Sequence, residues 1–180
     1  MFARLSRIIA VAALALSTIG VARASAQFEK GPFYVGPHIW IGGLNGATAI
    51  GAQIERGLTE PGAYGPGIIS GGLGVDYYSY DFGLAATGYK YKYIPFQLFS
   101  NYHWIVESNK KIDPYVGLAL VYNYVSVTYN SSTIRTGANG SGINFAGHAG
   151  LRYFISDNFA VHGQLGFGFG NLGLGVDWKF

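Results

Sequence analysis

The chain has 180 residues, of which 49% are hydrophobic, 16% aromatic and 12% charged, and it contains no cysteine. This composition excludes a disordered chain and a disulfide framework, and after the N-terminal segment no run of about 20 apolar residues predicts a membrane-spanning helix. The formal net charge of +3 comes from the first 26 residues, because without Arg4, Arg7 and Arg23 nine basic residues balance nine acidic ones. We therefore expect no nucleic-acid partner.

Residues 1–26 have the parts of a secretory signal peptide. Arg4 and Arg7 precede an apolar run at 8–21, and the sequence Ala24-Ser25-Ala26 forms an A-x-A cleavage site before Gln27. An anchoring helix is the alternative, but the apolar run is short and ends in small residues. The pattern predicts export, cleavage after Ala26, and one domain spanning 27–180.

The rest of the chain divides into eight segments of about ten residues with alternating apolar and polar side chains, separated by turn residues. These segments are predicted strands at 33–44, 67–76, 80–89, 94–104, 115–126, 143–154, 159–168 and 171–180. The two longest connections, 45–66 and 127–142, are rich in Gly, Ser, Thr and Asn, and we expect both to be exposed loops. Shorter turns are predicted at 77–79, 105–114 and 155–158.

Each predicted strand has one face without a charged residue. In the last strand this apolar face is Leu172, Leu174, Val176, Trp178 and Phe180, and in the strand 80–89 it begins at Tyr80, with Asp81 on the opposite face. The polar faces carry all four histidines and the charged residues within strands. The polar side chains that we single out as a cluster are His38, His148, Arg152, His162, Gln164 and Asp177.

A soluble barrel, such as a lipocalin-like periplasmic protein, would place the apolar face inside. The interior of eight strands is only just wide enough for ordinary side chains, so the bulky aromatic face fits better outside, against lipid. The outward aromatics gather near both strand ends with aliphatic residues between them, as in the girdles of outer-membrane barrels. The sequence predicts an all-β, eight-stranded antiparallel up-and-down transmembrane β-barrel, closed by pairing of 171–180 with 33–44.

Four stretches carry a resemblance to a known family: FYVGPHIWIG at 33–42, DPYVGLALVYNY at 113–124, GLRYFISDNFAVHGQLGF at 150–167 and NLGLGVDWKF at 171–180. They resemble the eight-stranded outer-membrane β-barrels of Gram-negative bacteria, of the OmpA/OmpX and opacity-protein type. The resemblance implies an integral outer-membrane location. It also implies that Val176, Trp178 and Phe180 form the signal read by the barrel-assembly machinery. The OmpA-type proteins that bind peptidoglycan use a separate soluble domain, and because this sequence stops at Phe180 we expect no cell-wall role.

The inward polar cluster leaves several kinds of chemistry to weigh. Arg152 and Asp177 lie on the polar faces of their strands, with His162 and Gln164 on the strand between, and we expect an ion pair because unpaired charge in a narrow interior is costly. His38 and His148 lie on strands that are not neighbours, without ligand spacing, so no metal or cofactor is predicted.

Enzymatic activity is not expected either, because hydrolysis would need a serine beside a histidine base, and no serine lies two positions from any histidine in the sequence. Ser100 and His103, the nearest pair, have opposite parity. The sequence favours a barrel of structural or surface-interaction type with a narrow polar lumen and no wide pore. A porin-like channel for small or hydrophobic solutes and a lipid-modifying enzyme are the alternatives. Expected partners are membrane lipid, the assembly machinery and an unidentified surface ligand at 45–66 and 127–142.

Overall fold

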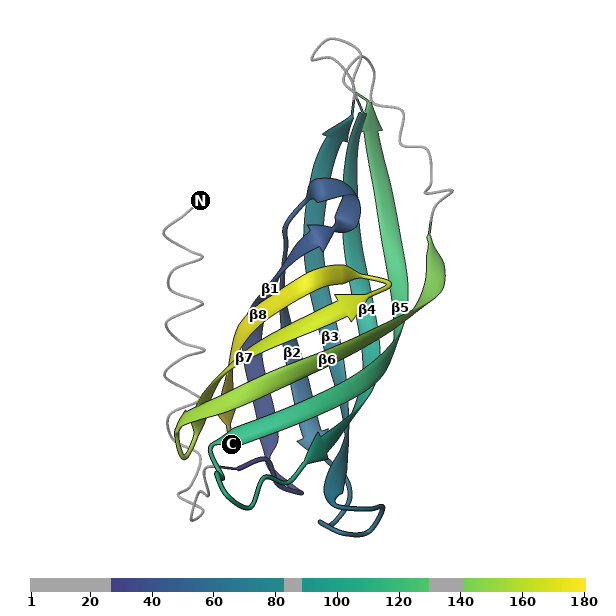
Figure 1. Cartoon of the computed structure of the whole chain (residues 1–180). Coiled ribbons are helices and arrows are strands. Elements are labelled where there is room, and N and C mark those ends of the chain that lie inside the picture. The colour runs from purple at the N-terminus through teal and green to yellow at the C-terminus, as the bar shows by residue number, and fades with distance from the viewer. Residues whose placement is uncertain (1–26, 83–88, 130–140) are drawn as a thin grey trace.

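Eight antiparallel strands form a closed barrel in the computed structural model, which describes residues 27–82, 89–129 and 141–180 (Figure 1). Each strand pairs with the next one along the chain, and β8 pairs with β1, which confirms the predicted fold class. Within the described residues, no helix is long and apolar enough to cross a membrane. The elements are β1 (Phe33–Gly43), the 3-10 turn η2 (Leu44–Gly46), β2 (Ala49–Gly57), β3 (Gly67–Phe82), β4 (Tyr89–Trp104), β5 (Ile112–Tyr129), β6 (Gly142–Ser156), β7 (Phe159–Phe167) and β8 (Gly170–Lys179).

The last strand closes the barrel against the first, as the sequence predicts. Ile39 pairs with Leu174 and Ile41 with Leu172. At the end of this seam Phe33 and Phe180 exchange two backbone hydrogen bonds, of 3.1 and 2.9 Å. Closure gives each strand a neighbour on both sides over the shared height of the barrel, which is the condition for strands to lie in lipid.

Side chains alternate strictly between the two faces of the sheet. Leu118, Phe145 and Leu165 point outward and are 71%, 79% and 67% exposed. On the opposite face Glu55, Asp113, Arg152, Gln164 and Asp177 point inward and are buried. The apolar surface of the barrel is therefore its outside, and its interior is polar.

The first third of the chain differs from the prediction. Residues 49–57, predicted within a loop at 45–66, form β2, and the predicted turn 77–79 lies inside the continuous strand β3. Tyr80 consequently points inward and Asp81 outward, opposite to expectation, and Asp81 is exposed. The β2 segment looks loop-like because it is short and carries Gly and charge, but its charged Glu55 has partners inside the barrel.

The two ends of the barrel are built differently. The terminal end holds residues 27 and 180 and the connections 58–66, 105–111 and 157–158; the loop end holds the opposite connections. At the loop end β3, β4 and β5, with 16, 16 and 18 residues, rise beyond the hairpin of β7 and β8, with 9 and 10 (Figure 1). The predicted loop 45–66 thus contributes 58–66 to the terminal end, and residues 1–26 and most of the predicted loop 127–142 lie outside the described residues.

Candidate functional site: the closed polar lumen

A buried arginine occupies the centre of the lumen toward the terminal end. Arg152, on β6, is 0% exposed and reaches carboxylates from three other strands. Its Nη2 donates to Glu55 Oε2 on β2 at 2.7 Å, its Nη1 to Asp113 Oδ2 on β5 at 3.1 Å, and its Nε to Asp177 Oδ2 on β8 at 2.8 Å. The guanidinium fork suits this task because its donors are fixed in one plane. Arg152 thereby ties four of the eight strands together across the barrel.

His103, on β4, is the second cation of this arginine network. Its Nδ1 lies 2.9 Å from Asp113 Oδ1 and its Nε2 lies 2.8 Å from Glu55 Oε1. Because an ionised carboxylate only accepts hydrogen bonds, both ring nitrogens must donate, and the ring is an imidazolium. His162 Nδ1 on β7 lies 2.7 Å from Asp177 Oδ2. Three carboxylates thus face one arginine and two histidines, which offsets the cost of burying charge.

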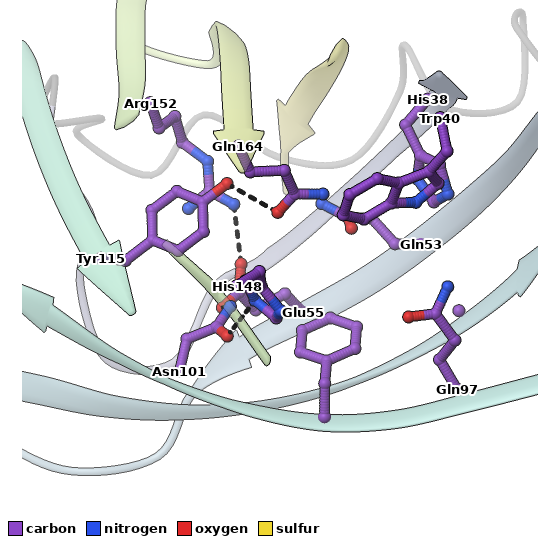
Figure 2. Close-up of a pocket in the computed structure, with 12 residues that line it drawn as sticks. His38, Trp40, Gln53, Glu55, Gln97, Asn101, Tyr115, His148, Arg152 and Gln164 are labelled. Atoms are coloured by element: carbon purple, nitrogen blue, oxygen red, sulfur yellow. Dashed lines mark hydrogen bonds and ion pairs between the residues drawn. The ribbon is translucent and has the colours of Figure 1, made fainter. Parts of the chain in front are cut away.

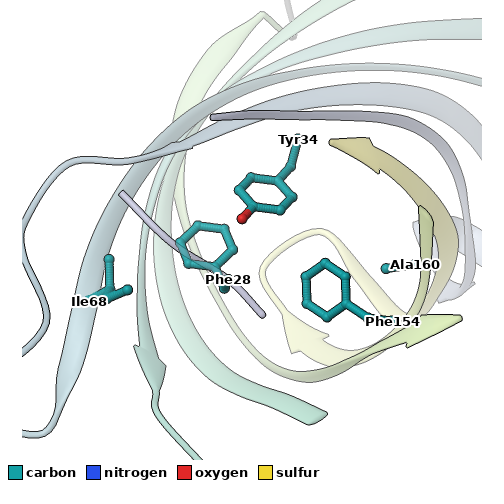
Figure 3. Packing of buried hydrophobic residues seen from close by; sticks show 5 residues of the cluster. All are labelled: Phe28, Tyr34, Ile68, Phe154 and Ala160. Atoms are coloured by element: carbon teal, nitrogen blue, oxygen red, sulfur yellow. The ribbon is translucent and has the colours of Figure 1, made fainter. Parts of the chain in front are cut away.

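An apolar cluster covers the terminal side of this network. It consists of the buried residues Phe28, Tyr34, Ile68, Phe154 and Ala160 (Figure 3). Phe28 precedes β1 and folds into the opening, where its ring stacks on His103 with centroids 3.6 Å apart. The Arg152 guanidinium carbon lies 5.2 Å from the centroids of both Phe28 and Tyr34. The apolar cluster therefore covers the ionic network at this end, and two of its rings make cation–π contacts with Arg152.

Toward the loop end the lumen becomes less charged and ends in aromatic rings. His38 Nε2 lies 2.7 Å from Asp76 Oδ1, and Gln97 Nε2 donates to Asp76 Oδ2 at 2.5 Å. Beyond them Trp40 packs in a cluster with Leu44 and Tyr78. Tyr78 also stacks on Tyr93, with centroids 4.6 Å apart, in a ladder that continues to Tyr80 and Tyr91. The lumen is therefore filled at this end as well.

Between the two ends lies a small cavity with a volume of about 10 Å³ (Figure 2). Trp40, Gln53, Gln97, His148 and Gln164 are among its lining residues. Such a volume holds about one water molecule. In the described part of the chain, His38 Nδ1, Trp40 Nε1 and His162 Nε2 are buried without a hydrogen-bond partner. As far as the described residues go, the interior is thus polar, and side chains fill it on both sides of this small cavity.

Comparison with proteins of known structure identifies the fold of the chain. No model of a protein family and no curated protein matches the chain. A de novo designed transmembrane β-barrel matches 86% of this chain and 99% of its own, with TM-score 0.55 and 14% identity. The N-terminal β-barrel domain of OprF from Pseudomonas aeruginosa (84% and 98%, TM-score 0.54, 18% identity) and the attachment invasion locus protein Ail of Yersinia pestis (84% and 100%, TM-score 0.54, 12% identity) match similarly. The chain has the fold of the eight-stranded outer-membrane β-barrels.

In this outer-membrane barrel fold the outward aromatics form two bands. At the terminal end the band contains Phe33, Tyr102, Trp104, Tyr153, Phe159 and Trp178, and at the loop end Tyr77, Tyr122, Tyr124, Phe145 and Phe167. Aliphatic side chains such as Leu73, Leu118 and Leu151 lie between the bands and are exposed. Tyr80, predicted in one of these bands, instead belongs to the inner tyrosine ladder.

The polar residues singled out in the sequence all point into the lumen, where His38, His148, Arg152 and Gln164 line the small central cavity. Arg152, His162 and Asp177 join the arginine network. His38 bonds Asp76, His148 Nε2 lies 2.8 Å from Asn101 Oδ1, and Gln164 Oε1 accepts a 3.1 Å hydrogen bond from Tyr115. In the described residues no group of His, Asp and Glu is arranged to hold a metal ion.

The sequence patterns do not predict two carboxylates of the arginine network, Glu55 and Asp113. Glu55 falls in the predicted loop 45–66 and Asp113 in the predicted turn 105–114, yet both are buried partners of Arg152. The signals that could have found them are the alternation Gln53, Glu55 between Ile50, Ala52 and Ile54, and the position of Asp113 just before the apolar alternation of β5.

A serine, a histidine and an aspartate do meet within the network. Ser70 Oγ lies 3.1 Å from His103 Nε2, and His103 Nδ1 lies 2.9 Å from Asp113 Oδ1. This arrangement does not activate the Ser70 hydroxyl as a nucleophile, because His103 already donates from both ring nitrogens and cannot accept the serine proton. The Ser70 hydroxyl also donates to Glu55 Oε1 at 2.5 Å, and its side chain is fully buried. Ser100, the serine weighed from the sequence, points outward.

Proposed function

We propose that the protein is an integral β-barrel of the Gram-negative outer membrane, of structural or surface-interaction type, with a closed lumen. The observation that supports this best is the inversion of the barrel: Arg152 and three carboxylates are buried inside, while leucines and aromatic rings cover the outside. In water such a surface would aggregate. In a bilayer it matches an apolar band between two aromatic girdles.

In our proposal the terminal end of the barrel faces the periplasm. A barrel with an even number of strands has both termini at one end, and an exported chain inserts from the periplasm. Val176, Trp178 and Phe180 lie at that end of the seam, where the assembly machinery would meet them. The wall of β3, β4 and β5 then projects outside the cell.

A surface ligand is the finer part of the proposal. The structurally similar Ail of Yersinia pestis has been crystallised with the heparin analogue sucrose octasulfate (TM-score 0.53). In our proposal the projecting wall and residues 127–142 carry the contact, since rigid scaffolds present binding loops. The predicted loop 45–66 is not part of this surface, because residues 49–57 form β2 and residues 58–66 lie at the terminal end.

The filled lumen argues against the channel alternative. Arg152 and its carboxylates cross the interior, apolar clusters cover both ends, and the cavity between them is about 10 Å³. An eight-stranded barrel has little interior to spare. We expect no stable conductance steps of porin size from residues 27–180 refolded into a planar bilayer; reproducible steps would favour the channel.

Topology can be tested by trypsin on intact cells. Lys110 lies in the exposed turn between β4 and β5 at the terminal end, and Arg135 lies in the predicted loop 127–142. We expect external trypsin to cut after Arg135 and to spare Lys110, with both sites cut once the cells are opened. An Arg135→Gln variant is the control, since it should lose the external cut alone. Recovery of the protein in the soluble periplasmic fraction without detergent would overturn the membrane proposal.

A further inference from the structure

The lipid-facing surface has a groove with a volume of about 880 Å³. It runs across β8, β1, β2 and β3 and touches Ile94 on β4. Its middle lies at Pro37 and Ala52, which are directly opposite each other in β1 and β2. These two short outward side chains lie among longer ones: Ile39, Ile50, Tyr77 and Leu174. The groove is therefore a depression made by side-chain size in an otherwise bulky apolar belt.

A polar row of side chains begins just beyond the groove, toward the loop end. Lys92 pairs with Ser79 on β3 and with Ser126 on β5. All three residues alternate with inward-facing neighbours such as the buried Tyr78 and Val125, so they point outward. Lys92 is two residues beyond Ile94 on the same face, about 7 Å along the strand. One ammonium and two hydroxyls thus lie within side-chain reach of the end of the groove.

Lys92 keeps its charge available at this position. Within the described residues no carboxylate lies at ion-pair distance from its ammonium, whereas the next lysine, Lys90, lies 3.9 Å from Asp81. Tyr77 and Tyr124, in the aromatic band, mark the depth at which the apolar part of the membrane ends. Lys92 therefore lies at the level of the lipid headgroups, where a lysine favours anionic lipid.

We propose that this surface binds one phosphate-bearing lipid of the outer leaflet, with an acyl chain in the groove and the phosphate against Lys92, Ser79 and Ser126. The site rests on the proposed membrane location and adds a specific lipid to it. The chain and headgroup parts of the site are continuous along β3 and β4, so a single amphipathic molecule can satisfy both. Free phosphate would use only the polar row, and a second barrel would bring no anion to Lys92.

Native mass spectrometry of residues 27–180, refolded in detergent, can test the site. The probes are phosphatidic acid, phosphatidylcholine with the same acyl chains, and inorganic phosphate. We expect the wild type to bind one phosphatidic acid in preference to phosphatidylcholine, and to retain no inorganic phosphate. Lys92→Gln should weaken phosphatidic acid binding about fivefold, the contribution of one interfacial lysine, and leave phosphatidylcholine unchanged. Ala52→Leu, which fills the groove, should weaken both lipids.

Lys110→Gln, in an exposed turn at the other end, is the matched control and should bind both lipids as the wild type does. Both test positions point outward, so the variants should fold normally. Wild-type binding by Lys92→Gln and Ala52→Leu in a correctly inserted barrel would overturn the site alone, as would an equal loss in Lys110→Gln or a dimer that excludes lipid from the groove. A chain that never inserts into bilayers would overturn the proposed function as well.

Discussion

The two halves of the lumen are built from the same inward face but by different chemistry. The terminal half holds the arginine network, in which Arg152 is bonded to three carboxylates. The loop half holds the His38–Asp76 pair, the tyrosine ladder and Trp40, whose indole N–H has no hydrogen-bond partner among the described residues. The first half depends on charged bonds around one arginine, whereas beyond the His38–Asp76 pair the second depends on ring packing. The barrel therefore should tolerate substitution very unevenly along its axis.

Removal of the central cation should have the largest effect. Arg152→Met leaves the carboxylates of Glu55, Asp113 and Asp177 buried without the cation that they share, and we expect the free energy of unfolding to fall by about 3–5 kcal/mol. Urea titration of the refolded barrel in lipid vesicles, followed by tryptophan fluorescence, measures it. Lys110→Met, in an exposed turn, is the control and should leave the midpoint unchanged. An equal midpoint for the two variants would show that the network does not stabilise the terminal half.

Removal of one carboxylate should cost less. Asp177→Ala takes one partner from Arg152 and the hydrogen-bond partner of His162 Nδ1, while Glu55 and Asp113 remain. Charged hydrogen bonds of this kind contribute about 1.5–3 kcal/mol, so we expect a lower unfolding temperature in detergent than that of the wild type. Asp157→Ala, in the exposed turn between β6 and β7, is the matched control. A melting profile like that of the wild type would contradict a stabilising role for the Arg152–Asp177 pair.

The same contrast explains what the sequence could predict. Strands β6, β7 and β8, predicted at 143–154, 159–168 and 171–180, lie at 142–156, 159–167 and 170–179, because strict alternation is a local signal. Strand β2 was missed because its charge looks like a loop until the partner is known, and Arg152 is 97 positions away along the chain. Likewise the inward position of Tyr80 depends on pairing of β3 with β4, which no local pattern specifies. Period two predicted the faces of the barrel, whereas the centre of the site required the register between strands.

The terminal half also depends on its apolar cover. Phe28→Ala removes the ring that stacks on His103 and Tyr34, and we expect the free energy of unfolding to fall by about 2 kcal/mol, the worth of burying one such side chain. Hydrogen exchange should also rise at residues 27–32, which the ring holds in the opening. Phe28→Leu keeps most of the apolar volume and should lose less. If both variants unfold like the wild type, the segment before β1 does not contribute to the folded apolar cluster.

The smallest effects should come from a pair of substitutions that differ only in which half they touch. Tyr115→Phe, in the terminal half, removes the hydroxyl that bonds Gln164 and leaves a buried oxygen without its donor, at a cost of about 1–1.5 kcal/mol. Trp40→Phe, in the loop half, breaks no hydrogen bond to the described residues, because Trp40 Nε1 has no partner among them. The lost ring contacts are offset by removal of a buried donor without a partner, so its unfolding midpoint should stay within about 1 kcal/mol of the wild type. Urea titration of the two variants side by side compares the contribution of hydrogen bonds in the terminal half with that of ring packing in the loop half. A cost for Trp40→Phe above that of Tyr115→Phe would mean that the ring cluster around Trp40 contributes as much to stability as the hydrogen bonds of the terminal half.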